Sequence, residues 1–209
     1  MALLHEAELR PTKLELLASW LPGQDWRQGD PSADLVRVAA CRFDDPAGAV
    51  GIETMLVRTS DEAVHQVPLT YRDAPMDGGD RWLIGTTDHS VLGKRWVYDG
   101  CGDPVYVAAL ASVILAGASQ AEEFFEVDGQ LQRREANMTV TGSGQDADAP
   151  AIGSVRRIVD GDPTRIVTDS LELAIIRRLN GRTELAGATL TGTWSGQPTP
   201  VPLAYAVAR

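Results

Sequence analysis

The hydrophobic pattern of the first hundred residues predicts one short helix followed by a series of strands. Leucines recur at helical spacing after a T-x-x-E capping box that begins at Thr12, so we expect a helix over residues 12–21. Strand-like runs bounded by turn residues then cover residues 34–43, 50–58, 64–71, 81–86 and 94–98. Because the connections between the first three runs have hairpin length, these runs predict an antiparallel meander, and the last two runs are expected to add strands to the same sheet.

Alternation within the strands assigns side chains to the two faces of this sheet. In the run 50–58, Ile52, Thr54 and Leu56 share one face and Glu53 lies on the other. The economical arrangement is a half-buried sheet with the helix against its apolar face.

A second helix is expected over residues 103–116. Asp103 and Pro104 supply an N-cap and an N1 proline, and Gly117 supplies the C-terminal glycine. The residues between them are apolar almost all round, which indicates a helix buried between two halves of the structure. Further candidate strands cover 122–127, 130–141, 152–159, 164–178, 183–194 and 201–207, with 142–150 as a loop. The predicted fold class is α+β: an antiparallel sheet with packed helices, then a mostly β half.

Composition excludes some partners. The 209 residues fit one large domain or two small joined ones. A net charge of −10 disfavours nucleic acid and anionic membrane surfaces. Cys41 and Cys101 lie far apart without a CxxC motif, so we interpret them as small buried hydrophobes. The N-terminus lacks the features of an export signal and no apolar run reaches the length of a membrane span, so we expect a soluble, cytoplasmic protein.

Two stretches carry a resemblance to a known family. These are residues 67–72 (V-P-L-T-Y-R) and 84–99 (I-G-T-T-D-H-S-V-L-G-K-R-W-V-Y-D), the latter followed by Asp103-Pro104-Val105. Together they resemble the N-terminal cap region of actinobacterial maltokinases, over roughly residues 5–118. In that family the cap is cystatin-like and precedes a maltose kinase of the aminoglycoside-phosphotransferase type. Free-standing chains with the cap also occur.

The resemblance extends more weakly into the second half. Residues 134–140 are similar to the E-Q-S-N-T-S-V strand of the kinase N-lobe, and residues 173–179 to its L-K-L-F-R-R-L strand. On this alignment Ala174 occupies the position of the family's lysine that binds the nucleotide phosphates. The chain ends where the hinge between the kinase N-lobe and C-lobe should begin. The resemblance therefore implies a cap-like domain at 1–118 and a degenerate kinase N-lobe-like subdomain at 119–209.

The motifs of phosphoryl transfer are missing from the sequence. None of the three histidines begins an H-x-D, and there is no P-loop. The stretch Asp160-Gly161-Asp162 is better explained as a turn than as a metal pair. We expect no catalytic residue, no cofactor and no metal.

Five residues of the central motif are candidate ligand-binding positions: Asp88, His89, Arg95, Trp96 and Asp99. Adjacent residues on a strand point to opposite faces, so a hydrogen-bonded loop histidine is favoured over a catalytic relay. Trp82, Trp96 and Tyr98 could form a sugar-stacking shelf, although strand aromatics usually belong to the core.

Two functions, and a purely structural role as an interaction scaffold, are compatible with these residues. The leading hypothesis is a non-catalytic binding or regulatory module linked to trehalose, maltose or glycogen metabolism, with a kinase or glucan-metabolising enzyme as partner or a carbohydrate as ligand. The alternative is a carbohydrate-active enzyme or accessory subunit acting on α-glucan, with Asp88, His89 and Asp99 as acid/base groups.

Overall fold

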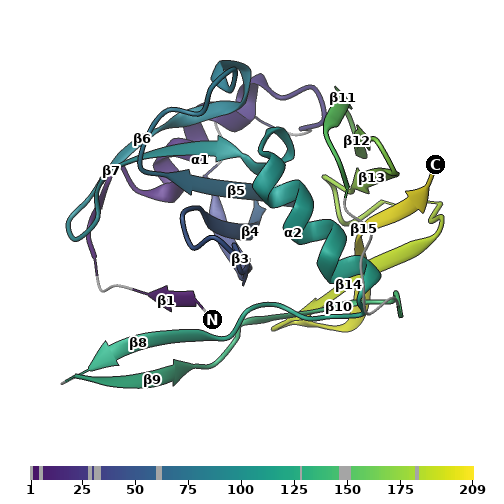
Figure 1. Cartoon of the computed structure of the whole chain (residues 1–209). Helices are drawn as coiled ribbons and strands as arrows, with labels where there is room; N and C mark the ends of the chain where they lie inside the picture. Colours follow the sequence, from purple (N-terminus) through teal and green to yellow (C-terminus); the bar gives the residue numbers. More distant parts are fainter. Residues whose placement is uncertain are drawn as a thin grey trace.

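The described residues form two six-stranded sheets and a small three-stranded sheet, together with two α-helices (Figure 1). The computed structural model describes residues 2–4, 7–27, 30, 34–59, 63–127, 129–145, 152–181 and 184–209. The expected loop at 142–150 therefore falls partly outside the described residues.

The first sheet has the strand order β2-β6-β7-β5-β4-β3 and is antiparallel throughout. Its strands are β2 (Leu9–Arg10), β3 (Val36–Phe43), β4 (Gly51–Arg58), β5 (Val64–Arg72), β6 (Leu83–His89) and β7 (Gly93–Asp99). Single 3-10 turns cover Leu21–Gly23, Asp80–Trp82 and Gly100–Gly102. The predicted meander of β3, β4 and β5 is confirmed. Strand β7 lies between β5 and β6, and a further short strand, β2, lies at one edge.

Helix α1 (Lys13–Trp20) packs on one face of this sheet. The predicted capping box is present: the Glu15 amide donates to Thr12 Oγ1 at 3.3 Å, and the Thr12 amide donates to Glu15 Oε2 at 2.7 Å. Leu16 and Leu17 of α1 pack against Met55, Val57 and other strand residues of that face.

Helix α2 (Pro104–Leu115) lies on the opposite face of the first sheet and separates it from the second sheet (Figure 1). Asp103 caps its first turn by accepting from the Val105 amide at 2.9 Å. Leu110 and Ile114 are buried in one cluster with Ile52 of β4 and Leu203 of the second sheet. The predicted buried, bridging helix is confirmed. The expectation of a half-buried sheet is wrong, because α1 and α2 cover both faces of β4.

The second sheet has the order β10-β14-β15-β13-β12-β11 and is also antiparallel. Its strands are β10 (Met138–Gly142), β11 (Val155–Val159), β12 (Thr164–Thr168), β13 (Leu171–Ile175), β14 (Ala188–Trp194) and β15 (Gln197–Ala208). The third sheet joins β1 (Ala2–Leu4), β8 (Glu123–Val127) and β9 (Gln130–Arg134), with β1 and β8 parallel. The whole is mostly β, with two α-helices among the described residues.

Two predicted strands are each split in two by a side-chain hydrogen bond. Between β9 and β10 the chain turns, and Asn137 Oδ1 accepts from the Ala40 amide of β3 at 3.0 Å. Between β12 and β13, Thr168 Oγ1 accepts from the Leu171 amide at 3.0 Å and holds a tight turn. Both features depend on specific polar contacts that hydrophobic patterning does not encode.

The two large sheets are also joined directly by hydrogen bonds at β5. The Leu179 amide donates to Val64 O at 2.9 Å, and the Gln66 amide donates to Arg177 O at 2.8 Å. The Gln66 side chain donates to the carbonyls of Ile176 and Leu203, at 3.0 and 2.9 Å. The first and second halves therefore share a hydrophobic core and are also connected by backbone hydrogen bonds.

Candidate functional site

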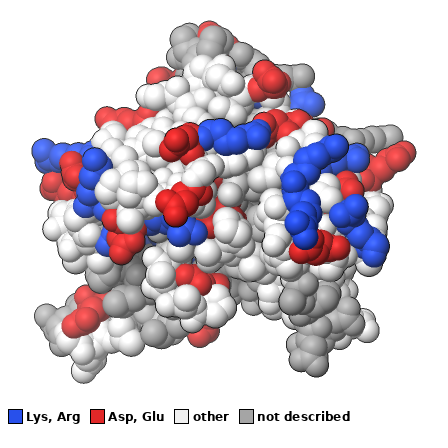
Figure 2. Space-filling model, turned by 45° about the horizontal axis from the view of Figure 1, so that its top comes forward, with Lys and Arg blue, Asp and Glu red and all other residues white. Residues whose placement is uncertain are grey.

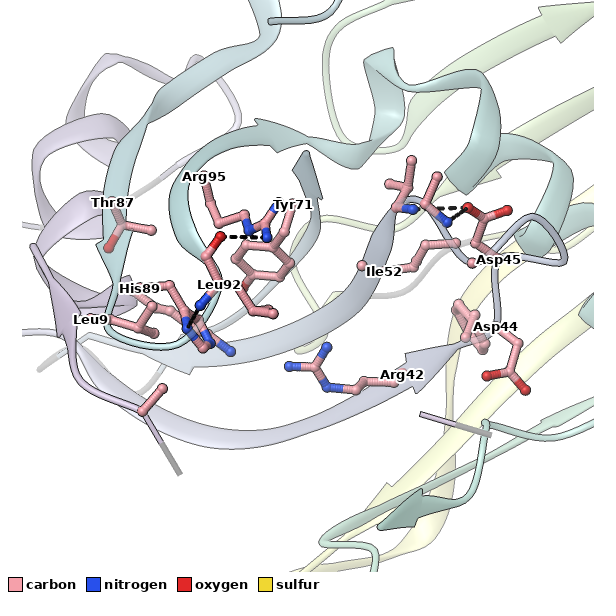
Figure 3. A pocket seen from close by; sticks show the side chains of 17 residues that line it. Leu9, Arg42, Asp44, Asp45, Ile52, Tyr71, Thr87, His89, Leu92 and Arg95 are labelled. Atoms are coloured by element: carbon pink, nitrogen blue, oxygen red, sulfur yellow. Dashed lines mark hydrogen bonds between the residues drawn. The ribbon is translucent and has the colours of Figure 1, made fainter. Parts of the chain in front are cut away.

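A pocket of about 480 Å³ lies at the N-terminal end of α1, between the turn after β3 and the turn after β6 (Figure 3). Short segments from six strands, from α1 and from the stretch before β2 contribute to it. Its polar lining consists of Lys13, Arg42, Asp44, Asp45, Tyr71, Thr87, His89 and Arg95.

A buried carboxylate, Glu53 of β4, holds several of these side chains in place. Glu53 is 2% exposed, and its Oε2 accepts from Lys13 Nζ and, at 2.8 Å, from the Tyr71 hydroxyl. Arg42 Nη2 lies 3.5 Å from the same oxygen. Lys13 Nζ also sits 5.0 Å from the centre of the Tyr71 ring. Because the carboxylate is buried, the geometry of the ion pair is fixed by packing as well as by charge.

This network shifts the ionisation of its members. Burial alone would raise the pKa of Glu53, but the charges of Lys13 and Arg42 and the hydrogen bonds from Lys13 and Tyr71 outweigh it and lower the pKa to about 2. Burial lowers the pKa of Lys13 although Glu53 opposes this. Burial, reinforced by Glu53, raises the pKa of the Tyr71 phenol well above its usual value. Glu53 is therefore ionised near neutral pH.

The β6–β7 hairpin forms the other wall. His89 Nδ1 accepts from the amides of Val91 and Leu92, at 3.2 and 3.1 Å. Arg95 Nη2 donates to Leu92 O at 2.6 Å, so both side chains brace the turn from the pocket side (Figure 3). The left-handed φ of +73° at Gly93 suits this tight turn. The expectation of a hydrogen-bonded loop histidine agrees with this geometry.

Of the five candidate residues, the structure places His89 and Arg95 in the pocket and the other three outside it. Asp88 is exposed and pairs across the hairpin with Lys94, whose Nζ lies 5.1 Å from the centre of the Trp96 ring. Asp99 is 2% exposed at the far end of β7. Six residues of strand, roughly 20 Å, separate it from the His89 end of the hairpin. Asp88, His89 and Asp99 therefore do not converge as an acid/base set.

The aromatic shelf, the less favoured interpretation of Trp82, Trp96 and Tyr98, is not formed. Trp82 is 8% and Tyr98 is 2% exposed, so both belong to the interior. The Tyr98 hydroxyl accepts from the Met76 amide at 2.8 Å and anchors the loop before β6. Trp96 is half-buried.

Asp99 instead belongs to a buried cluster around Arg177. Arg177 is 0% exposed, and its guanidinium donates to Asp99 Oδ2 at 2.6 Å and to Thr164 Oγ1 at 2.8 Å. It also lies 3.1 Å from Cys101 Sγ and 4.8 Å from the Trp26 ring centre. Nothing in the local sequence distinguishes Arg177 from an exposed strand-end arginine, because its partners come from distant segments.

The remaining sequence predictions concern small features. Cys41 and Cys101 are buried free thiols, as expected. Residues 160–163 form the turn between β11 and β12, and the carboxylate of Asp162 accepts from the Arg178 guanidinium at 2.7 Å.

In the part of the chain that the structure describes, no group of three or more His, Cys, Asp or Glu side chains is placed to hold a metal ion. No helix of the described residues is long and apolar enough to span a bilayer.

Comparison with known proteins finds a family match within the first half. Residues 20–103, which contain β3 to β7 and most of the pocket lining, match the model of the maltokinase N-terminal cap domain. The resemblance to maltokinase caps is confirmed. Among solved structures, a glucosamine kinase in complex with glucosamine, ADP and inorganic phosphate is similar at 17% identity and a TM-score of 0.48. The match covers 95% of this chain and 41% of the kinase chain. No curated protein matches the chain.

Proposed function

We propose that this protein is a non-catalytic binding or regulatory module of the maltokinase-cap type, acting in trehalose, maltose or glycogen metabolism. The observation that carries the proposal is the position of the pocket. Its floor and walls are built largely from the segment that matches the cap domain, and the ion pair with buried Glu53 holds Lys13 in place. Preformed concave sites of this size are where proteins bind small molecules.

The domain arrangement proposed with this function places a cystatin-like cap at residues 1–118 and a degenerate kinase N-lobe-like subdomain at 119–209. A helix packed against an antiparallel sheet supports the first assignment. In the second, Ala174 is 0% exposed in the middle of β13, between β12 and β15. A methyl group at that position offers no cation to a nucleotide phosphate, which supports a role other than phosphoryl transfer.

The ligand proposed for the module is a small carbohydrate, and the partner a kinase or glucan-metabolising enzyme of the cytoplasm. Tyr71 gives the pocket an aromatic surface, and carboxylate, guanidinium and imidazole groups surround it. Such mixtures of donors and acceptors suit hydroxyl groups. With the proposed acid/base groups lying apart, binding is better supported than glycoside hydrolysis.

Two measurements test this proposal. The first is a thermal-shift screen of the full chain with glucose, maltose, trehalose and short maltooligosaccharides, with Tyr71→Ala as the pocket variant. The second is affinity purification from the native host with a tagged chain, followed by identification of bound kinases and glucan enzymes. A monomer with neither a ligand-dependent shift nor a specific partner of this class would refute the proposed function.

A further inference from the structure

We infer that Lys13, where it lines the pocket at the N-terminal end of α1, is a nucleophilic amine that forms a reversible imine with the carbonyl carbon of a small aldehyde. The inference rests on the proposed function only in taking this pocket as the place where a small molecule binds. It adds a covalent step and the chemical class of the molecule that takes part in it.

Lys13 reaches the pocket from the first residue of α1. Its side chain lines the cavity of about 480 Å³ and is 23% exposed. Nζ donates to Glu53 Oε2 and lies 5.0 Å from the centre of the Tyr71 ring, so the amine is held at a defined place in the wall. A cavity of this volume has room for a small molecule beside the amine.

Three cationic side chains surround the buried carboxylate of Glu53. Besides Lys13, Arg37 Nη2 lies 3.9 Å from Glu53 Oε1, and Arg42 Nη2 lies 3.5 Å from Glu53 Oε2. The two guanidinium groups stay protonated, whereas a buried lysine releases its proton readily. The repulsion among the three cations is therefore relieved most easily at Lys13. A desolvated lysine beside other cations is an activated nucleophile.

The ionisation of Lys13 agrees with this arrangement. Burial lowers the pKa of Lys13, and the charges of Arg42 and Arg37 act in the same direction, whereas Glu53 opposes them through its charge and its hydrogen bond. The Tyr71 hydroxyl donates to Glu53 at 2.8 Å, so the carboxylate keeps a partner when Lys13 is neutral. Release of the proton from Lys13 therefore does not leave a buried charge alone.

Other charged groups face this site from α1, from β8 and from the β6–β7 hairpin. Glu15 of α1 accepts from the Thr12 amide and hydroxyl, at 2.7 and 2.8 Å, in the capping box. Glu123 Oε1 of β8 lies 3.9 Å from Arg42 Nε, and Arg95 of the hairpin adds a further cation to the lining. The remaining titratable side chains of the lining are His89, on the hairpin, and Asp44 and Asp45, in the turn after β3 (Figure 3).

The charge of the whole molecule acts against release of a proton. The chain carries a net charge of −10, and acidic and basic side chains are interspersed over the face shown in Figure 2. A negative field favours protonated amines, so the nucleophilic character of Lys13 comes from its local surroundings.

The sequence contains one other lysine, Lys94, which serves as an internal control. Lys94 is exposed on the β6–β7 hairpin, and its Nζ lies 5.1 Å from the centre of the Trp96 ring. It lacks the burial that distinguishes Lys13.

The covalent step balances without a further reactant. The lone pair of neutral Nζ attacks the carbonyl carbon, and the two N–H protons end on the carbonyl oxygen, which leaves as water when the C=N bond forms. The imine nitrogen then takes up a proton. Overall, an ammonium group and an aldehyde become an iminium group and water, so the positive charge beside Glu53 is kept.

The experiment is reductive labelling of the full chain with glycolaldehyde and sodium cyanoborohydride, which converts the imine into a stable secondary amine. Peptide mass spectrometry then gives a separate rate for each lysine. At neutral pH we expect Lys13 to be labelled several-fold faster than Lys94, and the ratio to fall as the pH approaches about 10.4, where an ordinary lysine also loses its proton. In guanidinium chloride the two rates should become similar, because the fold creates the difference.

Variants test the role of the neighbouring cations. Arg42→Gln should slow the labelling of Lys13 at neutral pH and leave that of Lys94 unchanged. Arg37→Gln, at a side chain that is 37% exposed, should act in the same direction with less risk to the fold. Arg133→Gln removes a charge from exposed strand β9 and should leave both rates unchanged.

Labelling of Lys13 at a rate equal to or below that of Lys94 in the folded chain would overturn the inference, as would an undiminished Lys13 rate in both arginine variants. Such a result together with carbohydrate-dependent thermal shifts would leave the proposed function standing. Selective labelling of Lys13 without carbohydrate binding or a partner enzyme would preserve the inference and not that function.

Discussion

Replacing Arg177 by Met should destabilise the whole protein, because Arg177 ties the second half of the chain to the first. The side chain is 0% exposed and pairs with Asp99, itself 2% exposed, at 2.6 Å. Loss of one partner leaves a buried carboxylate without its counter-ion, which costs about 3–5 kcal/mol. That is a large part of a typical unfolding free energy of about 5–15 kcal/mol.

Urea denaturation followed by tryptophan fluorescence and circular dichroism measures the effect. We expect one transition by both probes, since α2 and the two large sheets share one hydrophobic cluster. A double-mutant cycle with Asp99→Asn should show that the double variant loses less than the sum of the two single variants. The control is Arg133→Met, which breaks a 3.0 Å pair with Glu122 between side chains that are 69% and 56% exposed.

The control should change stability by well under 1 kcal/mol. If Arg177→Met also costs less than about 1 kcal/mol, or if the cycle is additive, the cluster does not join the halves and the argument fails. Separate transitions for the two halves would likewise contradict a shared core.

The other predictions concern the core, the buried carboxylate and nucleotide binding. Leu110→Ala in α2, at a side chain 1% exposed, should cost about 2–5 kcal/mol in the same urea assay, and a change below 1 kcal/mol would show a peripheral helix. Because the pKa of Glu53 falls from 4.5 unfolded to about 2 folded, its stabilisation is complete above pH 4.5 and is lost as the pH falls through 2. At about 1.4 kcal/mol per pKa unit, the stabilisation from Glu53 amounts to about 3 kcal/mol. Glu53→Gln should therefore reduce the loss of unfolding free energy at acid pH, and an unchanged pH dependence would contradict the ion-pair assignment. With Ala174 at the phosphate-lysine position, calorimetry with Mg-ATP should show no binding tighter than about millimolar, or about −4 kcal/mol, and a saturable micromolar isotherm would require realignment of the second half.

Local sequence signals predicted the elements well. The capping box at Thr12 and the Asp103-Pro104 helix start depend on residues within one turn of each other, so the sequence alone locates both helices. The two-residue period of strands also separates His89 from Asp88 and Arg95 from Trp96, which is why one member of each pair lines the pocket.

Features that depend on distant partners could not be predicted in this way. Arg177 and Asp99 are 78 residues apart, and Lys13 and Glu53 are 40 residues apart. Glu53 was correctly placed opposite Ile52, but its burial follows from Lys13, Tyr71 and α1 covering that face. The pocket itself exists only after several hairpins and α1 have been brought together.

The central claim is that the protein is a binding module whose ligand occupies the pocket at α1. The most direct test is to titrate the ¹⁵N-labelled chain with maltose and with glucose 6-phosphate and to map the changes in backbone amide chemical shifts. We predict saturable shift changes concentrated at Lys13, Arg42, Tyr71, His89 and Arg95, and no change in strand β9. The absence of saturable shifts with either ligand, or shifts centred on another surface, would contradict it.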